Sequence, residues 1–214
     1  MNEIQYTLIT DGPSDRALIP ILTWVLHKNG DVKKVQSEWA DLSRLPEPPK
    51  NLCNRILRAI DLYPCDLIFI HRDAEKEEMK TRYMEIQQAI YEAASNGFHT
   101  PAICVVPVRM TESWLLFDEK AIRFAAGNPN GKQALKIPEL SQIENIPNPK
   151  DILFDLLKEA SGLTGRRLKK FSPGEARVRI SELITDFSPL RILRAFQHLE
   201  KNISLLKHNN WHMV

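Results

Sequence analysis

Four short apolar runs, each followed by a turn and a helix-like segment, constrain the fold of this chain more than any other feature. The runs cover residues 3–10, 32–39, 65–71 and 101–108. After each run, apolar residues recur at helical spacing, in the segments 18–26, 52–60, 75–95 and 111–117. Strands that alternate with helices in this way pair in parallel and are covered by the helices. The order predicts an α/β fold, with a mainly parallel sheet of about four strands flanked by helices.

The composition changes after about residue 126. Residues 127–149 contain glycine, asparagine and four prolines with little periodicity, so we interpret them as a long irregular linker. Helical patterns return at 151–160, 173–185 and 189–206. We therefore expect an α/β domain over residues 1–126, the linker, and a small helical lobe over residues 150–214 that packs on the domain.

The composition is that of a soluble protein with one substantial core. Of the 214 residues, 43% are hydrophobic, and the net charge of +2 argues neither for nor against a polyanionic partner. Cys53, Cys65 and Cys104 lack C-x-x-C spacing and lie in or beside apolar stretches, which favours buried, reduced thiols. No apolar run is long enough to span a bilayer, and Asn2-Glu3 stands where a signal peptide carries basic residues. We expect a cytoplasmic protein without a membrane partner.

Carboxylates follow three of the apolar runs, where the predicted strands end. They are Asp11, Asp15, Asp73, Glu75, Glu112 and Asp118. In an open α/β sheet the carboxyl ends of the strands form the crevice where ligands bind. Carboxylates that converge there repel one another unless a cation lies between them, and Mg²⁺ and Mn²⁺ prefer such oxygen ligands. The pattern predicts a divalent-metal site for phosphoryl transfer.

The first acidic motif, Asp11-Gly12-Pro13-Ser14-Asp15, lies between a strand and a helix. Its glycine permits a tight turn, and the N-terminus of the following helix offers N–H groups to an anion. The motif is not a Walker A loop, because the Gly-Lys-Ser/Thr ending is absent. The alternative interpretation is a turn in which Ser14 or Asp15 only caps the helix.

The second motif, His71-Arg72-Asp73-Ala74-Glu75, directly follows a buried-strand pattern. Side chains two residues apart on a strand point the same way, so His71 and Asp73 should face one crevice and could both bind a metal. Glu75 is a further candidate ligand. It is equally explained as a carboxylate at the start of the next helix, where negative charge is favourable.

The third motif places Glu112 in the first turn of a helix over 111–117, with Thr111 as a plausible cap. Glu112 could be a metal ligand or only a carboxylate that interacts with the helix dipole. Asp118 is expected near the end of that helix, where negative charge is unfavourable. It is therefore a candidate to bind Arg109 or a metal.

A basic run, Arg166, Arg167, Lys169 and Lys170, is predicted to lie in a glycine-flanked loop of the helical lobe. These side chains could contact backbone phosphates of DNA or RNA, with Phe171 available for stacking. The alternative is a solvated surface loop.

These motifs resemble those of TOPRIM domains, which carry an acidic residue in a strand–glycine turn–helix unit and a D-x-D motif at the end of a later strand. The likeness is greatest to small stand-alone TOPRIM-like proteins of bacteria, related to the nuclease half of overcoming-lysogenization-defect (OLD) enzymes. Their E-G-x-S/T-D/E pattern is similar to residues 11–15, and their E-x-W-L-L-x-D pattern, the most specific element, is similar to residues 112–118. Asp11 replaces the family's glutamate, and His71 replaces the first aspartate of D-x-D unless the motif shifts to Asp73-Ala74-Glu75. An imidazole ligand favours Mn²⁺ over Mg²⁺.

The resemblance implies a nuclease that uses Mg²⁺ or Mn²⁺ to cut DNA or RNA, with Asp11, Asp73 and Glu112 as catalytic residues. It also implies an ABC-type ATPase partner and a role in anti-phage defence. Two alternatives stay open. In one, the acidic set has decayed and the chain is a docking or sensing module, with a face formed by Leu190, Leu193, Phe196 and Leu199, although core packing explains these residues equally. In the other, the chain is a nucleotide phosphohydrolase that does not need the basic run.

Overall fold

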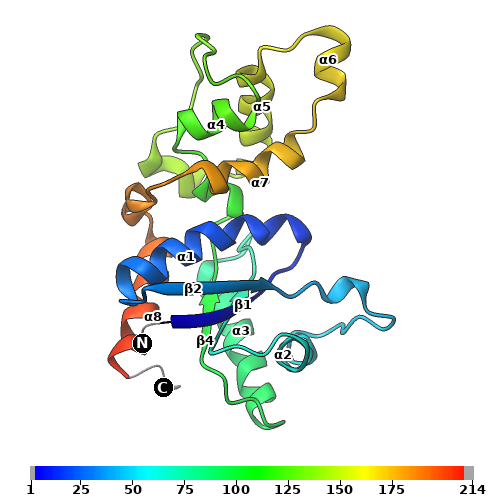
Figure 1. The fold of residues 1–214 in the computed structure, drawn as a ribbon, viewed down its shortest axis with the longest axis vertical. Helices are drawn as coiled ribbons and strands as arrows, with labels where there is room; N and C mark the ends of the chain where they lie inside the picture. Colours follow the sequence, from blue (N-terminus) through cyan, green and yellow to red (C-terminus); the bar gives the residue numbers. More distant parts are fainter. Residues whose placement is uncertain (1–2, 210–214) are drawn as a thin grey trace.

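A four-stranded, all-parallel sheet organises the chain (Figure 1). The structure is a computed structural model and describes residues 3–209. The strand order is β2-β1-β3-β4. The strands are β1 (Glu3–Ile9), β2 (Lys34–Trp39), β3 (Leu67–His71) and β4 (Ala102–Val105). The predicted α/β fold with a parallel sheet of four strands is confirmed.

The burial of each strand follows from its position in the sheet. Every residue of β3 is buried, as expected for a central strand covered on both faces. By contrast, residues of β2 alternate between half-buried and exposed because this strand forms an edge. Tyr6 of β1 and Phe69 of β3 lie edge to face, with ring centroids 5.1 Å apart, beneath one face of the sheet.

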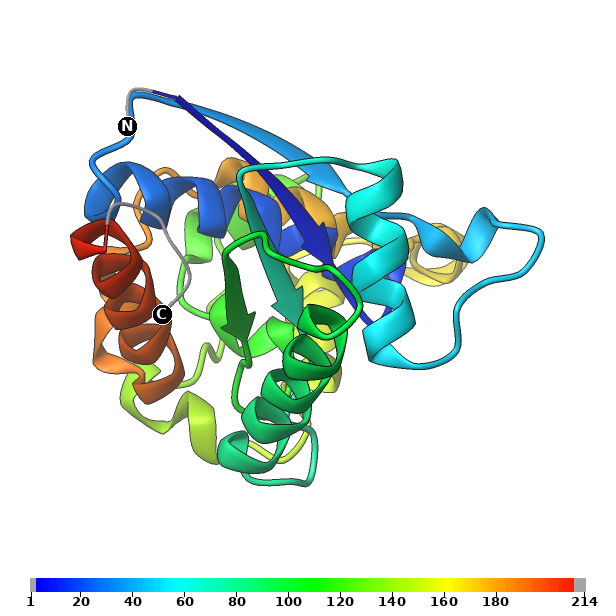
Figure 2. The ribbon, with the colours of Figure 1, turned by 90° about the horizontal axis from the view of Figure 1, so that it is seen from below.

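Helices cover both faces of the sheet, as the view in Figure 2 shows. Helices α1 (Leu18–Asn29) and α8 (Arg194–His208) cover one face, and α2 (Leu52–Leu62) and α3 (Met79–Ala94) cover the other. The chain therefore leaves β1 toward one face and β3 toward the opposite face. Neighbouring strands whose connections diverge in this way form a topological switch point, where open α/β sheets bind ligands at the carboxyl ends of the strands.

The remaining helices form a lobe beyond α1 (Figure 1). They are α4 (Glu119–Ala125), α5 (Pro149–Ser161), α6 (Gly165–Lys170) and α7 (Pro173–Leu183). One continuous hydrophobic core joins the lobe to the sheet, since Trp114, Leu153 and Ile180 belong to the same buried cluster as Leu8 and Phe69. The last helix, α8, leaves the lobe and packs on α1 and β4. Phe196 of α8 lies against Trp114, with ring centroids 5.5 Å apart.

Several predicted elements have different bounds in the structure. The helix expected from residue 75 begins at Met79, because Glu75 adopts a left-handed backbone conformation with φ of 53°. The helix expected over 111–117 is a 3-10 helix at Thr111–Trp114, and the capping position before it is taken by Met110. The pattern over 189–206 is broken at Leu193, which is extended and separates a 3-10 helix from α8.

Two further expectations for the second half were wrong in detail. The basic run is not a loop: it forms α6, since Arg, Leu and Lys are strong helix formers. The segment 127–149 is mostly irregular as predicted, but a 3-10 helix forms within it at Leu140–Asn145.

Two other predictions concern burial: that of the cysteines, and that of the apolar stripe formed by Leu190, Leu193, Phe196 and Leu199. Cys53 and Cys104 are buried free thiols, and Cys65 is half-buried. Leu190, Leu193, Phe196 and Leu199 are buried, so the core interpretation of that stripe is confirmed and the docking-face interpretation is not. Across residues 3–209, none of the helices combines the length and hydropathy needed to cross a bilayer.

Candidate functional site

The first two acidic motifs meet at the switch point between β1 and β3. These strands are neighbours, and Ile9, the last residue of β1, pairs with Ile70 of β3. The turn that carries Asp11 and Asp15 therefore lies beside the strand end that carries His71 and Asp73. The predicted convergence of these side chains follows from the parallel pairing of two buried strands.

Asp15, His71 and Asp73 form a row across the switch point. Nε2 of His71 lies 3.0 Å from Oδ1 of Asp73, and Nδ1 of His71 lies 3.8 Å from Oδ2 of Asp15. The His71 side chain is fully buried, and its Nδ1 has no hydrogen-bond partner among the described residues. Oδ2 of Asp15 also accepts the Gly12 N–H at 3.1 Å, so Asp15 both closes its turn and faces His71.

The two carboxylates perturb the protonation of the imidazole. Burial alone lowers the pKa of His71, but the hydrogen bond to Asp73 and the charges of Asp73, Asp15 and Asp11 outweigh it, so the pKa is raised. Burial raises the pKa of Asp15, and the opposing attraction of His71 only partly offsets this. His71 and Asp15 therefore each bind a proton more tightly than the same side chain does in an unfolded chain.

The loop after β4 is attached to this row. The N–H of Thr111 donates to Oδ1 of Asp73 at 2.9 Å, and the Thr111 hydroxyl lies 3.2 Å from both Asp73 Oδ1 and His71 Nε2. Nearby, the Glu75 N–H donates to the Arg109 carbonyl at 2.7 Å, and Nη1 of Arg109 donates to the Glu75 carbonyl at 3.0 Å. Both residues have positive φ, 53° and 66°, a conformation that costs energy in residues other than glycine. The loops after β3 and β4 are thus held together beside the site.

Asp11 lies at the open side of the site and contacts two arginines. Its carboxylate is 3.4 Å from Nη1 of Arg55 and 3.5 Å from Nε of Arg72, and 41% of its side chain is exposed. Arg55 also donates to the carbonyl of Thr10. Asp11 is therefore the carboxylate of this group that solvent or a substrate reaches most readily.

Glu112 lies behind the row, in a buried ion pair with Arg177 of α7. The two side chains are 3% and 8% exposed. Burial lowers the pKa of Arg177, while the charges of Asp15 and Asp73 act in the opposite direction. The sequence analysis did not identify Arg177. One local indication was present in the sequence. Arg177 follows Ala176 and precedes Ile180 by three residues, so it lies on the apolar, buried face of α7.

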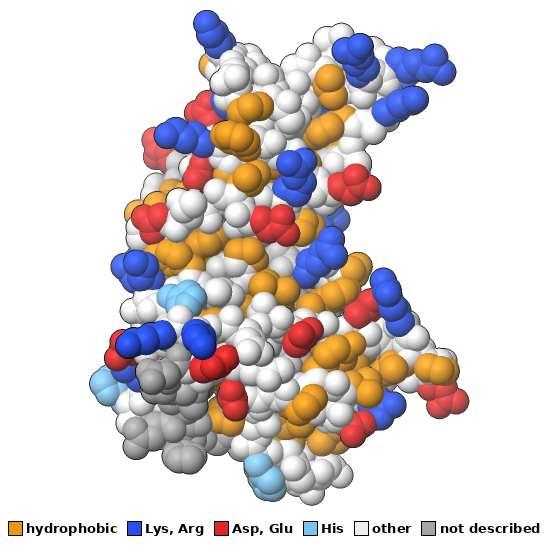
Figure 3. Space-filling view, viewed as in Figure 1, with side chains coloured by type: hydrophobic (Ala, Val, Ile, Leu, Met, Phe, Trp, Pro, Cys, Tyr) orange, Lys and Arg blue, Asp and Glu red, His pale blue; other side chains and the backbone are white. Residues whose placement is uncertain are grey.

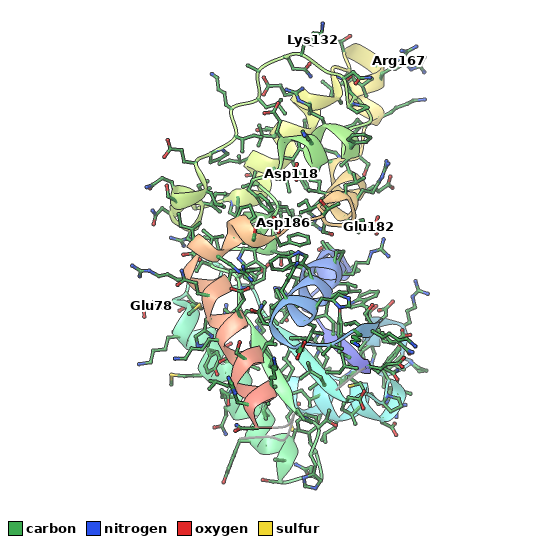
Figure 4. The ribbon with its side chains drawn as sticks, turned by 60° about the vertical axis from the view of Figure 1, so that its left-hand side comes forward. Glu78, Asp118, Lys132, Arg167, Glu182 and Asp186 are labelled. Atoms are coloured by element: carbon green, nitrogen blue, oxygen red, sulfur yellow. The ribbon has the colours of Figure 1, made fainter. Side chains whose placement is uncertain are left out.

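Two predicted residues are not part of this group. Glu75 is exposed and its carboxylate is 3.6 Å from Arg82. Asp118 does not end a helix; it begins one, because its side chain accepts the N–H of Ala121 at 2.9 Å and caps α4. Figure 4 shows Asp118 among the helices of the lobe. The expectations that it binds Arg109 or a metal have no support in this placement.

The basic run lies on the rim of a hollow. Arg166, Arg167, Lys169 and Lys170 are all exposed on α6. Figure 3 shows the outline of the molecule hollowed on the side where α6 and the segment 42–50 project, with basic side chains gathered over α6. Helix α7, which follows α6 closely in the chain, packs on the 13–17 turn that carries Asp15.

Comparisons with protein-family models, with curated proteins and with solved structures give no match to this chain. The resemblance to TOPRIM domains therefore depends on the sequence motifs alone.

The residues at the site offer the kinds of atom that bind a divalent cation, but their side chains do not already surround a single point. Asp11, Asp15 and Asp73 provide carboxylate oxygens, and the orphaned Nδ1 of His71 provides a nitrogen. Within residues 3–209, no three His, Cys, Asp or Glu side chains already surround one point where an ion could lie. A mixed oxygen and imidazole set fits Mn²⁺ better than Mg²⁺, which prefers oxygen ligands only.

Proposed function

We propose that this protein is a metal-dependent nuclease whose site lies at the carboxyl ends of β1 and β3. The observation that carries the proposal is the convergence of Asp11, Asp15, His71 and Asp73 at the topological switch point of a parallel sheet. Open α/β sheets bind their ligands at such points. Groups with a perturbed pKa, as found here at Asp15 and His71, are also a common feature of catalytic sites.

In this proposal Asp15, Asp73 and the His71 imidazole hold Mn²⁺ or Mg²⁺. When bound, the cation would polarise the scissile phosphate and lower the pKa of a water ligand. Asp11, the most exposed carboxylate of the group, is suited to orient the attacking water. Arg72, which contacts Asp11 and Glu85, supplies positive charge beside the exposed carboxylate.

The basic side chains of α6 support nucleic acid as the substrate. Four exposed cations on the rim of the hollow could bind backbone phosphates of a strand that extends away from the site. The resemblance adds an ABC-type ATPase partner and a role in bacterial anti-phage defence, and a cytoplasmic location agrees with the free cysteines. These additions rest on the motifs and on composition.

A second candidate, a docking or sensing module without hydrolytic activity, is favoured by one observation. Each carboxylate of the site already has a basic side chain beside it: Arg55 and Arg72 at Asp11, His71 between Asp15 and Asp73, and Arg177 at Glu112. Such pairing removes the repulsion that would otherwise call for a metal ion.

Cleavage and thermal-shift assays separate these candidates. Purified protein would be incubated with labelled DNA and labelled tRNA, each with Mg²⁺ or Mn²⁺, and its melting temperature measured with and without metal. The nuclease proposal expects products and a metal-dependent rise in melting temperature, since a ligand that binds only the folded state stabilises it. Absence of both favours the docking module. Cleavage of a small chromogenic phosphodiester but of neither nucleic acid favours a nucleotide phosphohydrolase.

A further inference from the structure

A small pocket opens beside Asp11, on the side away from the Asp15–His71–Asp73 row. Its volume is about 190 Å³, and it lies between the end of β2 and the segment 42–50. Its lining includes Thr10, Asp11, Trp39, Leu42, Pro49 and Arg55. Because Thr10 and Asp11 belong to the turn that also carries Asp15, the pocket and the acidic site share one wall.

The walls of the pocket combine apolar side chains with polar ones that are held in place by hydrogen bonds. Nε1 of Trp39 donates to the hydroxyl of Thr10 at 3.0 Å, which fixes the indole at the end of β2. Arg55 donates to the carbonyl of Thr10 and lies 3.4 Å from Asp11, so its guanidinium is fixed as well. Leu42 and the proline pair Pro48-Pro49 complete the apolar surface. Aromatic and guanidinium planes are the surfaces on which proteins stack unpaired bases.

The size and charge of the pocket restrict what it accepts. Pockets for drug-sized ligands measure about 300–1,000 Å³, so a volume of about 190 Å³ suits a single ring system and excludes a base pair. The Asp11 and Asp41 carboxylates in the lining disfavour a phosphate inside the pocket, and Arg55 is already engaged by Asp11 and Thr10. An attached phosphate would instead lie outside the pocket, over the acidic site.

We propose that this pocket holds one unpaired nucleobase of the substrate, directly beside the phosphate that lies over the acidic row. The inference rests on the proposed nuclease function and names its substrate class: single-stranded, frayed or flipped-out nucleotides. Perfectly paired duplex does not present a free base to the pocket.

Calorimetric titration of the metal-free protein with AMP and with ribose 5-phosphate tests the pocket without any turnover. AMP should bind more tightly by about tenfold or more, the size expected when one base stacks on an aromatic side chain. Ser43, exposed at the mouth, allows Ser43→Trp to fill the pocket, and Pro48→Trp is a second filling variant. Both should reduce AMP binding to the ribose 5-phosphate level, whereas Ser95→Trp, an exposed site outside the pocket, should not.

Equal binding of AMP and ribose 5-phosphate by the wild type, or no AMP binding at all, would overturn the proposal. So would folded Ser43→Trp and Pro48→Trp variants that keep the preference for AMP. Because metal is absent, these results are independent of cleavage. A base preference in a protein that cuts nothing would retain the pocket and reject the nuclease.

Discussion

Arg177 and Glu112 form a buried ion pair that joins helix α7 of the lobe to the turn after β4. Removing one partner of a buried pair leaves the other charge uncompensated and costs roughly 3–5 kcal/mol of unfolding free energy. We expect Glu112→Leu and Arg177→Met each to destabilise by about that amount. The double variant Glu112→Leu with Arg177→Met should lose much less than the sum of the single losses. Urea denaturation of the four proteins measures this, and additive losses would show that the two side chains are not coupled.

The His71 row predicts a pH dependence of stability. The folded-state pKa of His71 is raised, so the folded protein binds the proton more tightly than the unfolded chain does. The stabilisation is complete below the ordinary histidine pKa of about 6.5 and is lost as the pH rises through the folded-state value. We expect the unfolding free energy of the metal-free protein to fall as the pH rises above about 6.5, measured up to the ordinary cysteine pKa of about 8.5.

His71→Gln should remove that fall, and His99→Gln, at an exposed position, should keep it. The measurement is urea denaturation at a series of pH values with a chelator present. A wild-type free energy that rises across this window would mean that His71 is neutral in the folded protein.

The charge of α6 should control the salt sensitivity of nucleic-acid binding. For single strands, each lost phosphate contact lowers the slope of log affinity against log salt by about 0.7, so neutralising Arg166, Arg167, Lys169 and Lys170 should lower it by at most about 3. Stability should change by less than about 0.5 kcal/mol because all four side chains are exposed. Lys33→Gln with Lys34→Gln, beside the start of β2 and away from the carboxyl edge, is the control. An unchanged slope in the α6 variant would show that the run is only a solvated surface.

Phe196 distinguishes a core helix from a docking helix. It is fully buried and lies edge to face against Trp114. Phe196→Ala should cost about 3–5 kcal/mol of unfolding free energy. Ile192→Ala, at a side chain that is 56% exposed, should cost less than about 0.5 kcal/mol. Thermal or urea denaturation measures both losses. A small loss in Phe196→Ala would support the interpretation of the Leu190, Leu193, Phe196 and Leu199 stripe as a docking face.

The sheet and the convergence of the first two motifs were predictable because both depend on local sequence. Apolar β-branched runs predicted β1 and β3, and the parallel pairing of neighbouring strands brought Asp15 close to His71 and Asp73. In each case the deciding signal lies within a few residues of the element that it predicts.

Interactions between distant segments were not predictable from pattern. Sixty-five residues separate Glu112 from Arg177, and no local signal connects them. Asp118 was misinterpreted for the opposite reason: the helix before it is a short 3-10 turn, so the aspartate caps the next helix and does not face the site. Tertiary packing decided both outcomes.

Cleavage by two matched aspartate variants tests the central claim most directly. Asp73→Asn keeps the shape of the side chain and an acceptor for the Thr111 N–H but removes the charge beside His71. Asp118→Asn keeps the cap of α4, since asparagine is an equally good N-cap residue. With Mn²⁺ or Mg²⁺ and labelled single-stranded DNA or tRNA, we expect the wild type and Asp118→Asn to cut at similar rates and Asp73→Asn to lose activity by at least about a hundredfold. Equal rates in folded Asp73→Asn and wild-type protein would contradict a catalytic site at the ends of β1 and β3.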